Sequence, residues 1–185
     1  LNLCVKNLEN ISALHMINND TLLADVCLAA LHEGAAISAD HGKHQLTNEG
    51  SQLCTMLARS FADIGDIVRG KDLYRGNNGK DKLESKLKVI FGKIHGGLSR
   101  TNGKNGQKSA KDHYKDGAPD FYQLREDWWY ANRGTVWYAI TCGAGQNDKY
   151  FRQTCSNDTA DTHEKCRCRI YKVPTFFDYV PQYLR

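Results

Sequence analysis

The sequence predicts an all-α fold, in which a disulfide-stapled helical bundle carries long irregular loops. Apolar side chains recur every three or four residues in several segments, which is the spacing of one helix face. Seven cysteines, four of them within residues 142–168, are suited to covalent staples in an oxidising compartment. At 185 residues, with 41% hydrophobic and 25% charged side chains, the chain has the size and composition of one globular domain.

Residues 1–50 are expected to contain opening helices and a loop. One helix should begin at a cap formed by Asn19 or Asp20 and should end at Gly34, because glycine is a frequent helix terminator. The polar residues 38–45 then form the loop. No apolar run approaches the length of a membrane span, so a membrane anchor is expected outside this chain.

Residues 51–94 are expected to supply the core helices. In SQLCTMLARSFADIGDIVRGK the apolar side chains form one stripe of a helix, and burial of each contributes roughly 1.5 to 3 kcal/mol. Residues 80–94 form a further amphipathic helix with lysines on its polar side. The side chains predicted for the structural core, two of them from a later helix, are Leu53, Leu57, Phe61, Ile64, Trp128 and Trp129.

Residues 95–118 are rich in Gly, Asn, Lys and Ser and are expected to form a long basic surface loop. Six basic and two acidic residues between positions 93 and 116 give +4, which equals the formal net charge of the whole chain, so the basic character is local. A contact for a sulfated glycan or a phosphate backbone is one interpretation of this segment, and a solvated linker is the simpler one, because charged loops are usually just solvated. The candidate glycan- or receptor-binding residues are Lys93, Arg100, Lys104, Lys108, Lys111 and Lys115.

Residues 119–142 are expected to form a helix that is buried between others, with Pro119 in its first turn. Arg125 and Arg133 are interleaved with its aromatic side chains, a pattern that also occurs where nucleic-acid bases stack. At helical spacing, beside an apolar face, the aromatic side chains are more typical of a core.

Residues 143–173 form a polar, cysteine-rich segment that staples would have to order. Cys166 and Cys168 would point to the same side of an extended chain, and a bond between such close neighbours would be strained, so each is expected to pair elsewhere. A zinc site that includes His163 is an alternative with a weak signal, because a second close cysteine pair is missing.

The connectivity of the cysteines stays open at this point. A Cys27–Cys54 bridge is compatible with two successive helices that pack antiparallel, and the odd number of cysteines indicates a partner outside the chain. The disulfide candidates are Cys4, Cys27, Cys54, Cys142, Cys155, Cys166 and Cys168.

Residues 174–185 are expected to begin a helix, with Asp178 as its N-cap and Pro181 in its first turn, that is truncated at Arg185. The chain contains none of the motifs of P-loop nucleotide binding, zinc proteases or serine hydrolases. We therefore expect no enzymatic activity, no cofactor and no metal site.

Five blocks of sequence, which together span nearly the whole chain, carry a family resemblance. They are LCVKNLENI, LLADVCLAALHEG, SQLCTMLARSFADIGDIVRGKDLY, REDWWYANRGTVWYAITC and PTFFDYVPQYLR. The chain resembles a Duffy-binding-like domain of the alpha class, from the variant erythrocyte-membrane adhesion proteins of malaria parasites. The ARSFADIGDIVRG and FDYVPQYLR blocks are highly specific to it.

The resemblance implies an all-helical adhesion module on the surface of the infected erythrocyte, subject to antigenic variation and associated with rosetting. Its implied partners are host cell-surface receptors, among them heparan sulfate, blood-group sugars and complement receptors, and neighbouring adhesion domains of the same polypeptide, but no nucleic acid. The chain looks like the middle half of such a domain, without the beginning of the first subdomain and the final helical subdomain. The alternative is an intracellular nucleic-acid-binding or zinc-binding module that uses the basic loop and the cysteines.

Overall fold

The regular secondary structure of the described residues is helical, which confirms the predicted fold class. The computed structural model describes residues 18–44, 52–73, 79–98, 109–117 and 119–185. Its long helices are α2 (Asn19–His44), α3 (Leu53–Arg69), α4 (Gly79–Gly97) and α6 (Tyr122–Ile140). Its short helices are α5 (Ala110–His113) and three single 3-10 turns, η2 (Lys115–Gly117), η3 (Phe177–Tyr179) and η4 (Gln182–Leu184).

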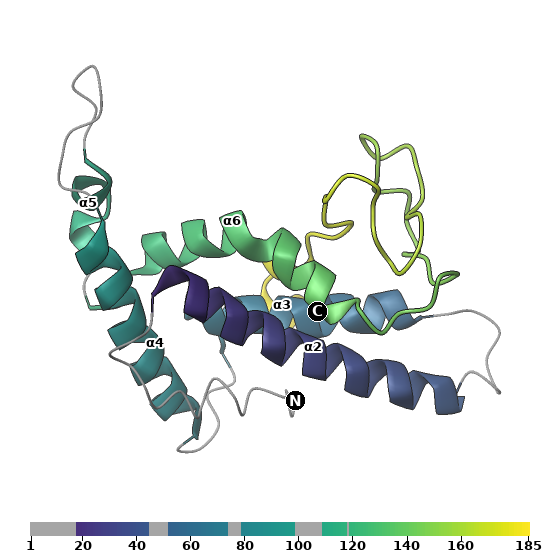
Figure 1. The fold of residues 1–185 in the computed structure, drawn as a ribbon, viewed down its shortest axis with the longest axis horizontal. Coiled ribbons are helices and arrows are strands. Elements are labelled where there is room, and N and C mark those ends of the chain that lie inside the picture. The colour runs from purple at the N-terminus through teal and green to yellow at the C-terminus, as the bar shows by residue number, and fades with distance from the viewer. Residues whose placement is uncertain (1–17, 45–51, 74–78, 99–108, 118) are drawn as a thin grey trace.

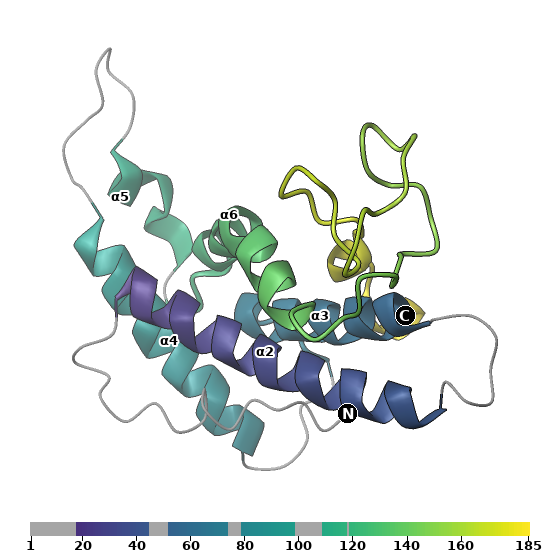
Figure 2. The same ribbon diagram turned by 45° about the vertical axis from the view of Figure 1, so that its right-hand side comes forward.

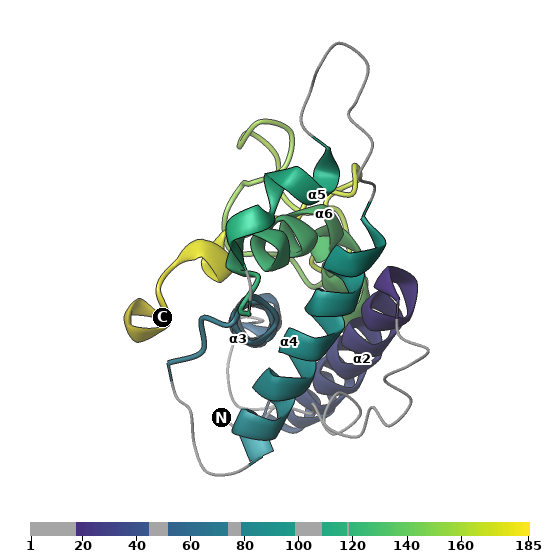
Figure 3. The same cartoon turned by 90° about the vertical axis from the view of Figure 1, so that its left-hand side faces the viewer.

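Helix α6 is the central helix of the bundle. It packs against both α2 and α3, which also contact each other, so the three helices share one core (Figure 1). Helix α4 crosses beside them at one end of the molecule, with α5 next to its C-terminal end (Figure 3). The irregular, cysteine-rich segment 143–173 lies at the other end, beyond the C-terminal end of α6 (Figure 2).

The core is centred on Phe61 of α3. Its ring lies 5.1 Å from the ring of Trp129 and 5.2 Å from that of Trp137, both on α6. Trp128, on the next face of α6, meets Phe91 of α4 at 6.1 Å, so the aromatic side chains link three helices. The side chains expected in the core are all buried, with at most 5% of each exposed: Leu53, Leu57, Phe61, Ile64, Trp128 and Trp129.

Helix α2 is longer than the sequence predicts, because it continues through Gly34 and residues 38–44, where a loop was expected. Gly34 is buried, and a Cβ atom there would overlap the main-chain oxygen of Ile140 on α6. The glycine therefore permits close helix contact instead of ending the helix. The stretch Asn19–His41 also corrects the expectation on membrane-length runs, because by length and composition alone it is apolar enough to cross a membrane. Its buried residues, such as Leu22 and Val26, belong to the common core.

The segment that leads into α6 also differs from the prediction. The helix begins at Tyr122 and not at Pro119, because Phe121 adopts the left-handed conformation with φ of 53°. This turn places the Phe121 ring 5.3 Å from that of His95 on α4. Within the expected loop 95–118, α4 extends to Gly97 and residues 110–117 form α5 and η2, while residues 99–108 lie outside the described part of the chain.

The terminal segment 174–185 forms two 3-10 turns in place of the expected α-helix. Asp178 is not an N-cap, because its buried carboxylate accepts hydrogen bonds from Arg133 Nη2 at 2.7 Å and Trp129 Nε1 at 2.9 Å. Arg125 is likewise fully buried, and it donates to both carboxylate oxygens of Glu84 on α4. The two arginines of α6 thus serve the interior, where stacking with bases is excluded.

Two disulfides join segments that are distant or irregular. Cys54 of α3 is bonded to Cys166, and Cys155 is bonded to Cys168, so the two close cysteines do pair with different partners. The Cys27–Cys54 bridge considered from the sequence is wrong. Among the described residues, the thiol of Cys27 is half-buried and free, and that of Cys142 is exposed and free; Cys4 lies outside them.

We expect Gly34→Ala to destabilise the domain, because the added methyl group forces α2 and α6 apart. Overpacking of a close contact typically costs about 1 to 3 kcal/mol, measured as the free energy of unfolding in urea. Gly96→Ala is the matched control, since no atom lies within 4 Å of its added Cβ; this change should leave stability unchanged or raise it by up to about 1 kcal/mol. Equal effects of the two substitutions would contradict the helix contact.

Removal of the Cys54–Cys166 bridge should cost more stability than removal of the Cys155–Cys168 bridge. The two bonds span sequence separations of 112 and 13 residues. Loop-closure entropy in the unfolded chain then corresponds to about 5 and about 3 kcal/mol. Paired Cys→Ala variants, compared by thermal unfolding without reductant, provide the measurement, and a larger loss for the short loop would refute this order.

Candidate functional site

Of the six basic residues singled out in the sequence, three lie in the described part of the chain, near the end of α4, in α5 and in the turn η2 that follows it. Lys93 is exposed on the last turns of α4. Lys111 of α5 donates through Nζ to the main-chain oxygen of Gly96 at 3.3 Å, so it ties the two helices together. Lys115 forms an ion pair of 3.0 Å with Asp112. The other three candidates, Arg100, Lys104 and Lys108, lie outside the described residues.

A cavity of about 710 Å³ lies beside them, between the start of α2, the end of α4, Tyr114 after α5, and α6. Lys93 and the apolar side chains Ile94 and Leu98 line it from α4 and the residue after that helix. Trp128 and Asp127 line it from α6. The cavity therefore combines apolar walls with one basic and one acidic group at the surface, which is the usual make-up of a binding pocket.

Hydrogen bonds fix the polar side chains of this cavity. The Tyr114 hydroxyl donates to Asp127 Oδ2 at 2.8 Å, and Gln123 Nε2 donates to Asp127 Oδ1 at 3.0 Å. Trp128 Nε1 donates to Asn19 Oδ1 at 2.7 Å. Burial, together with the hydrogen bond to the Asp127 carboxylate, raises the pKa of Tyr114 to about 12. The hydroxyl therefore remains a neutral donor throughout the physiological range.

The sequence did not predict this cavity. Tyr114 and Asp127 are thirteen residues apart, on opposite sides of the left-handed turn at Phe121, and no local pattern brings them together. Only the excess of charge between positions 93 and 116 pointed to this end of the molecule.

The two disulfides use the cysteines that the zinc alternative requires. Cys155, Cys166 and Cys168 are all in bonds, so no thiolate remains at these positions to bind a metal ion. In the part of the chain that the structure describes, no three His, Cys, Asp or Glu side chains form a cluster that could hold a metal ion.

Comparison with known proteins gives matches over the whole chain. The family model of the Duffy binding domain matches residues 1–185. The chain is similar to the solved NTS-DBL1(alpha-1) domain of Plasmodium falciparum membrane protein 1 (PfEMP1) from the varO strain, with 36% identity and a TM-score of 0.75 over 98% of this chain and 39% of that one. No match was found among curated proteins.

Two further solved structures are DBLbeta domains. An ICAM-1-binding DBLbeta domain of a PfEMP1 shares 34% identity with a TM-score of 0.68, over 99% of this chain and 39% of that one. A second PfEMP1 DBLbeta domain, bound to human ICAM-1, shares 29% identity with a TM-score of 0.63, over 98% and 36%. The chain thus spans about two fifths of the solved chains that it matches.

We expect Asp127→Asn to lower the pKa of Tyr114 from about 12 towards the ordinary value near 10. The neutral amide no longer opposes ionisation of the hydroxyl, while the part of the shift due to burial stays. Because the raised pKa favours the protonated folded state, its contribution to stability is complete below pH 10 and is lost as the pH rises towards 12. NMR titration of ring-labelled tyrosine gives the pKa, with Asp161→Asn as a control at an exposed carboxylate, and an unchanged value in Asp127→Asn would contradict the contact.

Proposed function

The chain belongs to the Duffy binding domain family, and we propose on this basis that it is an adhesion module that binds a receptor on a host cell without catalysing a reaction. The observation that carries the proposal is the match to the family over residues 1–185, with the same fold in solved PfEMP1 domains. Two of these domains are named with the receptor ICAM-1. Because the chain spans only 36–39% of those chains, their receptor does not transfer to it.

The location that fits this function is the surface of the infected erythrocyte, as part of a larger membrane protein whose other adhesion domains are its neighbours. The two disulfides support an oxidising compartment. They favour an extracellular adhesion module over the intracellular nucleic-acid-binding or zinc-binding alternative.

The contact surface that we favour is the basic one at the junction of α4 and α5. Sulfated glycans carry dense negative charge, and several lysines on one surface bind such a chain in a strongly salt-dependent way. Three arginines, Arg69, Arg125 and Arg133, are buried and bonded internally, so they are not available to a polyanion. Lys93 and Lys115, by contrast, are exposed at the surface near α5, and a sulfated glycosaminoglycan such as heparin is the ligand class that fits exposed lysines.

Removal of four of the basic candidates between positions 100 and 111 should weaken retention on immobilised heparin. The variant replaces Arg100, Lys104, Lys108 and Lys111 with serine, and it should elute at a lower salt concentration because fewer ionic contacts oppose elution. Its helical content, measured by circular dichroism, should equal that of the parent.

The control removes the same number of charges from exposed sites elsewhere. It replaces Arg59, Lys82, Lys149 and Arg169 with serine, and it should elute close to the parent. If both variants elute together, retention reflects net charge alone and the junction of α4 and α5 is not the site.

A further inference from the structure

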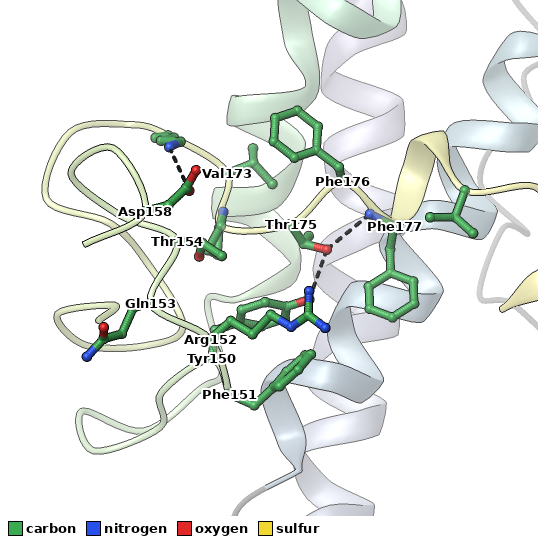
Figure 4. A pocket seen from close by; sticks show the side chains of 13 residues that line it. Tyr150, Phe151, Arg152, Gln153, Thr154, Asp158, Val173, Thr175, Phe176 and Phe177 are labelled. Atoms are coloured by element: carbon green, nitrogen blue, oxygen red, sulfur yellow. Dashed lines mark hydrogen bonds and ion pairs between the residues drawn. The ribbon is translucent and has the colours of Figure 1, made fainter. Parts of the chain in front are cut away.

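A second cavity, of about 470 Å³, opens between the cysteine-rich segment and the turn that leads into η3 (Figure 4). Phe151 contributes to one wall, and Phe176 and Val173 contribute to the other. Large apolar side chains are normally covered, yet Phe151 is 61% exposed and Phe176 is 62% exposed. Two exposed aromatic rings beside one cavity are typical of a surface that binds a partner.

The backbone around this cavity is anchored. The Tyr150 hydroxyl donates to Thr175 Oγ1 at 3.1 Å, and the main-chain nitrogen of Phe177 donates to the same oxygen at 3.1 Å (Figure 4). The main-chain nitrogen of Tyr150 donates to Thr162 Oγ1 at 2.9 Å. The opposing walls are thus connected before any partner arrives, which reduces the entropy that binding has to overcome.

The charges of the cavity are few and unbalanced. The Arg152 guanidinium lies 5.2 Å from the centre of the Phe151 ring and forms no ion pair with a carboxylate in the described part of the chain. Lys172, by contrast, is paired with Asp158 at 3.6 Å. The cavity also contains Thr154, whose buried Oγ1 has no hydrogen-bond partner among the described residues.

We propose that this cavity binds a protein segment in which an aliphatic or aromatic side chain lies next to a carboxylate. The apolar side chain fills the space between Phe151 and Phe176, and the carboxylate pairs with Arg152. A highly charged polyanion does not fit, because Arg152 is the one cation of the lining without a carboxylate partner among the described residues, and Asp158 adds a negative charge. Exposed aromatic side chains beside an arginine are also the residue types that dominate protein interfaces.

This site is separate from the basic surface at the junction of α4 and α5. Figure 1 shows the cysteine-rich segment and α5 at opposite sides of the molecule. The inference therefore goes beyond the proposed glycan contact and does not depend on it: the heparin variants test one surface and the experiment below tests the other.

A random peptide library, selected on the intact protein, tests the proposal. The selected peptides should share a Leu, Phe or Trp next to Asp or Glu. Arg152→Glu should reverse the preference from acidic to basic flanking residues and should weaken binding of a parent-selected peptide about tenfold or more. Arg169→Glu is the matched control, because Arg169 is exposed and does not line the cavity; it should select the same peptides as the parent.

The apolar half of the site has its own test. Phe151→Ser and Phe176→Ser should each weaken binding of the same peptide. Because both side chains are mostly exposed, neither substitution should change the fold, which circular dichroism checks. Selection of the same acidic peptides by Arg152→Glu would overturn the proposal, and so would unchanged binding in both serine variants. Failure of the intact protein to select any shared sequence would also overturn it, since the cavity would then be covered by the protein's own chain or would bind no peptide.

Discussion

The buried carboxylate of Asp178 is the interaction on which the arrangement of the terminal segment depends. It accepts two hydrogen bonds from Arg133, at 2.8 and 2.7 Å, and one from Trp129, at 2.9 Å. Arg69 of α3 donates to the main-chain oxygen of the same residue. A buried charge is tolerated only when it is paired and fully hydrogen-bonded, so these donors hold α3, α6 and the terminal segment in one geometry.

The irregular segment 143–173 is anchored to the same two helices, α3 and α6. Residues 143–173 contain isolated bridges but no extended strand or helix, and they are anchored to the helices at several points. The Cys54–Cys166 disulfide is one, and the main-chain oxygen of Cys166 also accepts a hydrogen bond from Trp137 of α6 at 3.1 Å. The aromatic core and the disulfide thus meet at one residue. Loops held in this way present their side chains on a rigid support, which is what surface recognition requires.

The helical framework could be predicted from the sequence where a pattern is local. The apolar stripe around Phe61 and the wide apolar arc of α6 both lie within single helices, so periodicity reveals them. Gly34 resembles a local helix stop and Asp178 resembles a local N-cap, so the sequence predicts the wrong role for each. Their actual roles are set by Ile140 and Arg133, which are distant in sequence. The excess of lysines pointed to the junction of α4 and α5, whereas the cavity there depends on a turn that no local pattern indicates.

The distant contacts of charged side chains also decide which charges of this chain lie at its surface. The formal charge of +4 includes three buried arginines, Arg69, Arg125 and Arg133. In the interior they donate hydrogen bonds to buried oxygens, and such charge-assisted bonds stabilise the fold more than an exposed cation does. Interior carboxylates such as Asp66 and Asp178 offset them. A partner therefore meets only the charges of the exposed side chains. These charges differ between the surface with the lysines near α5 and the cavity beside Phe151, where Arg152 forms no ion pair in the described part of the chain. A chain of modest net charge can in this way offer two chemically different surfaces on one helical support.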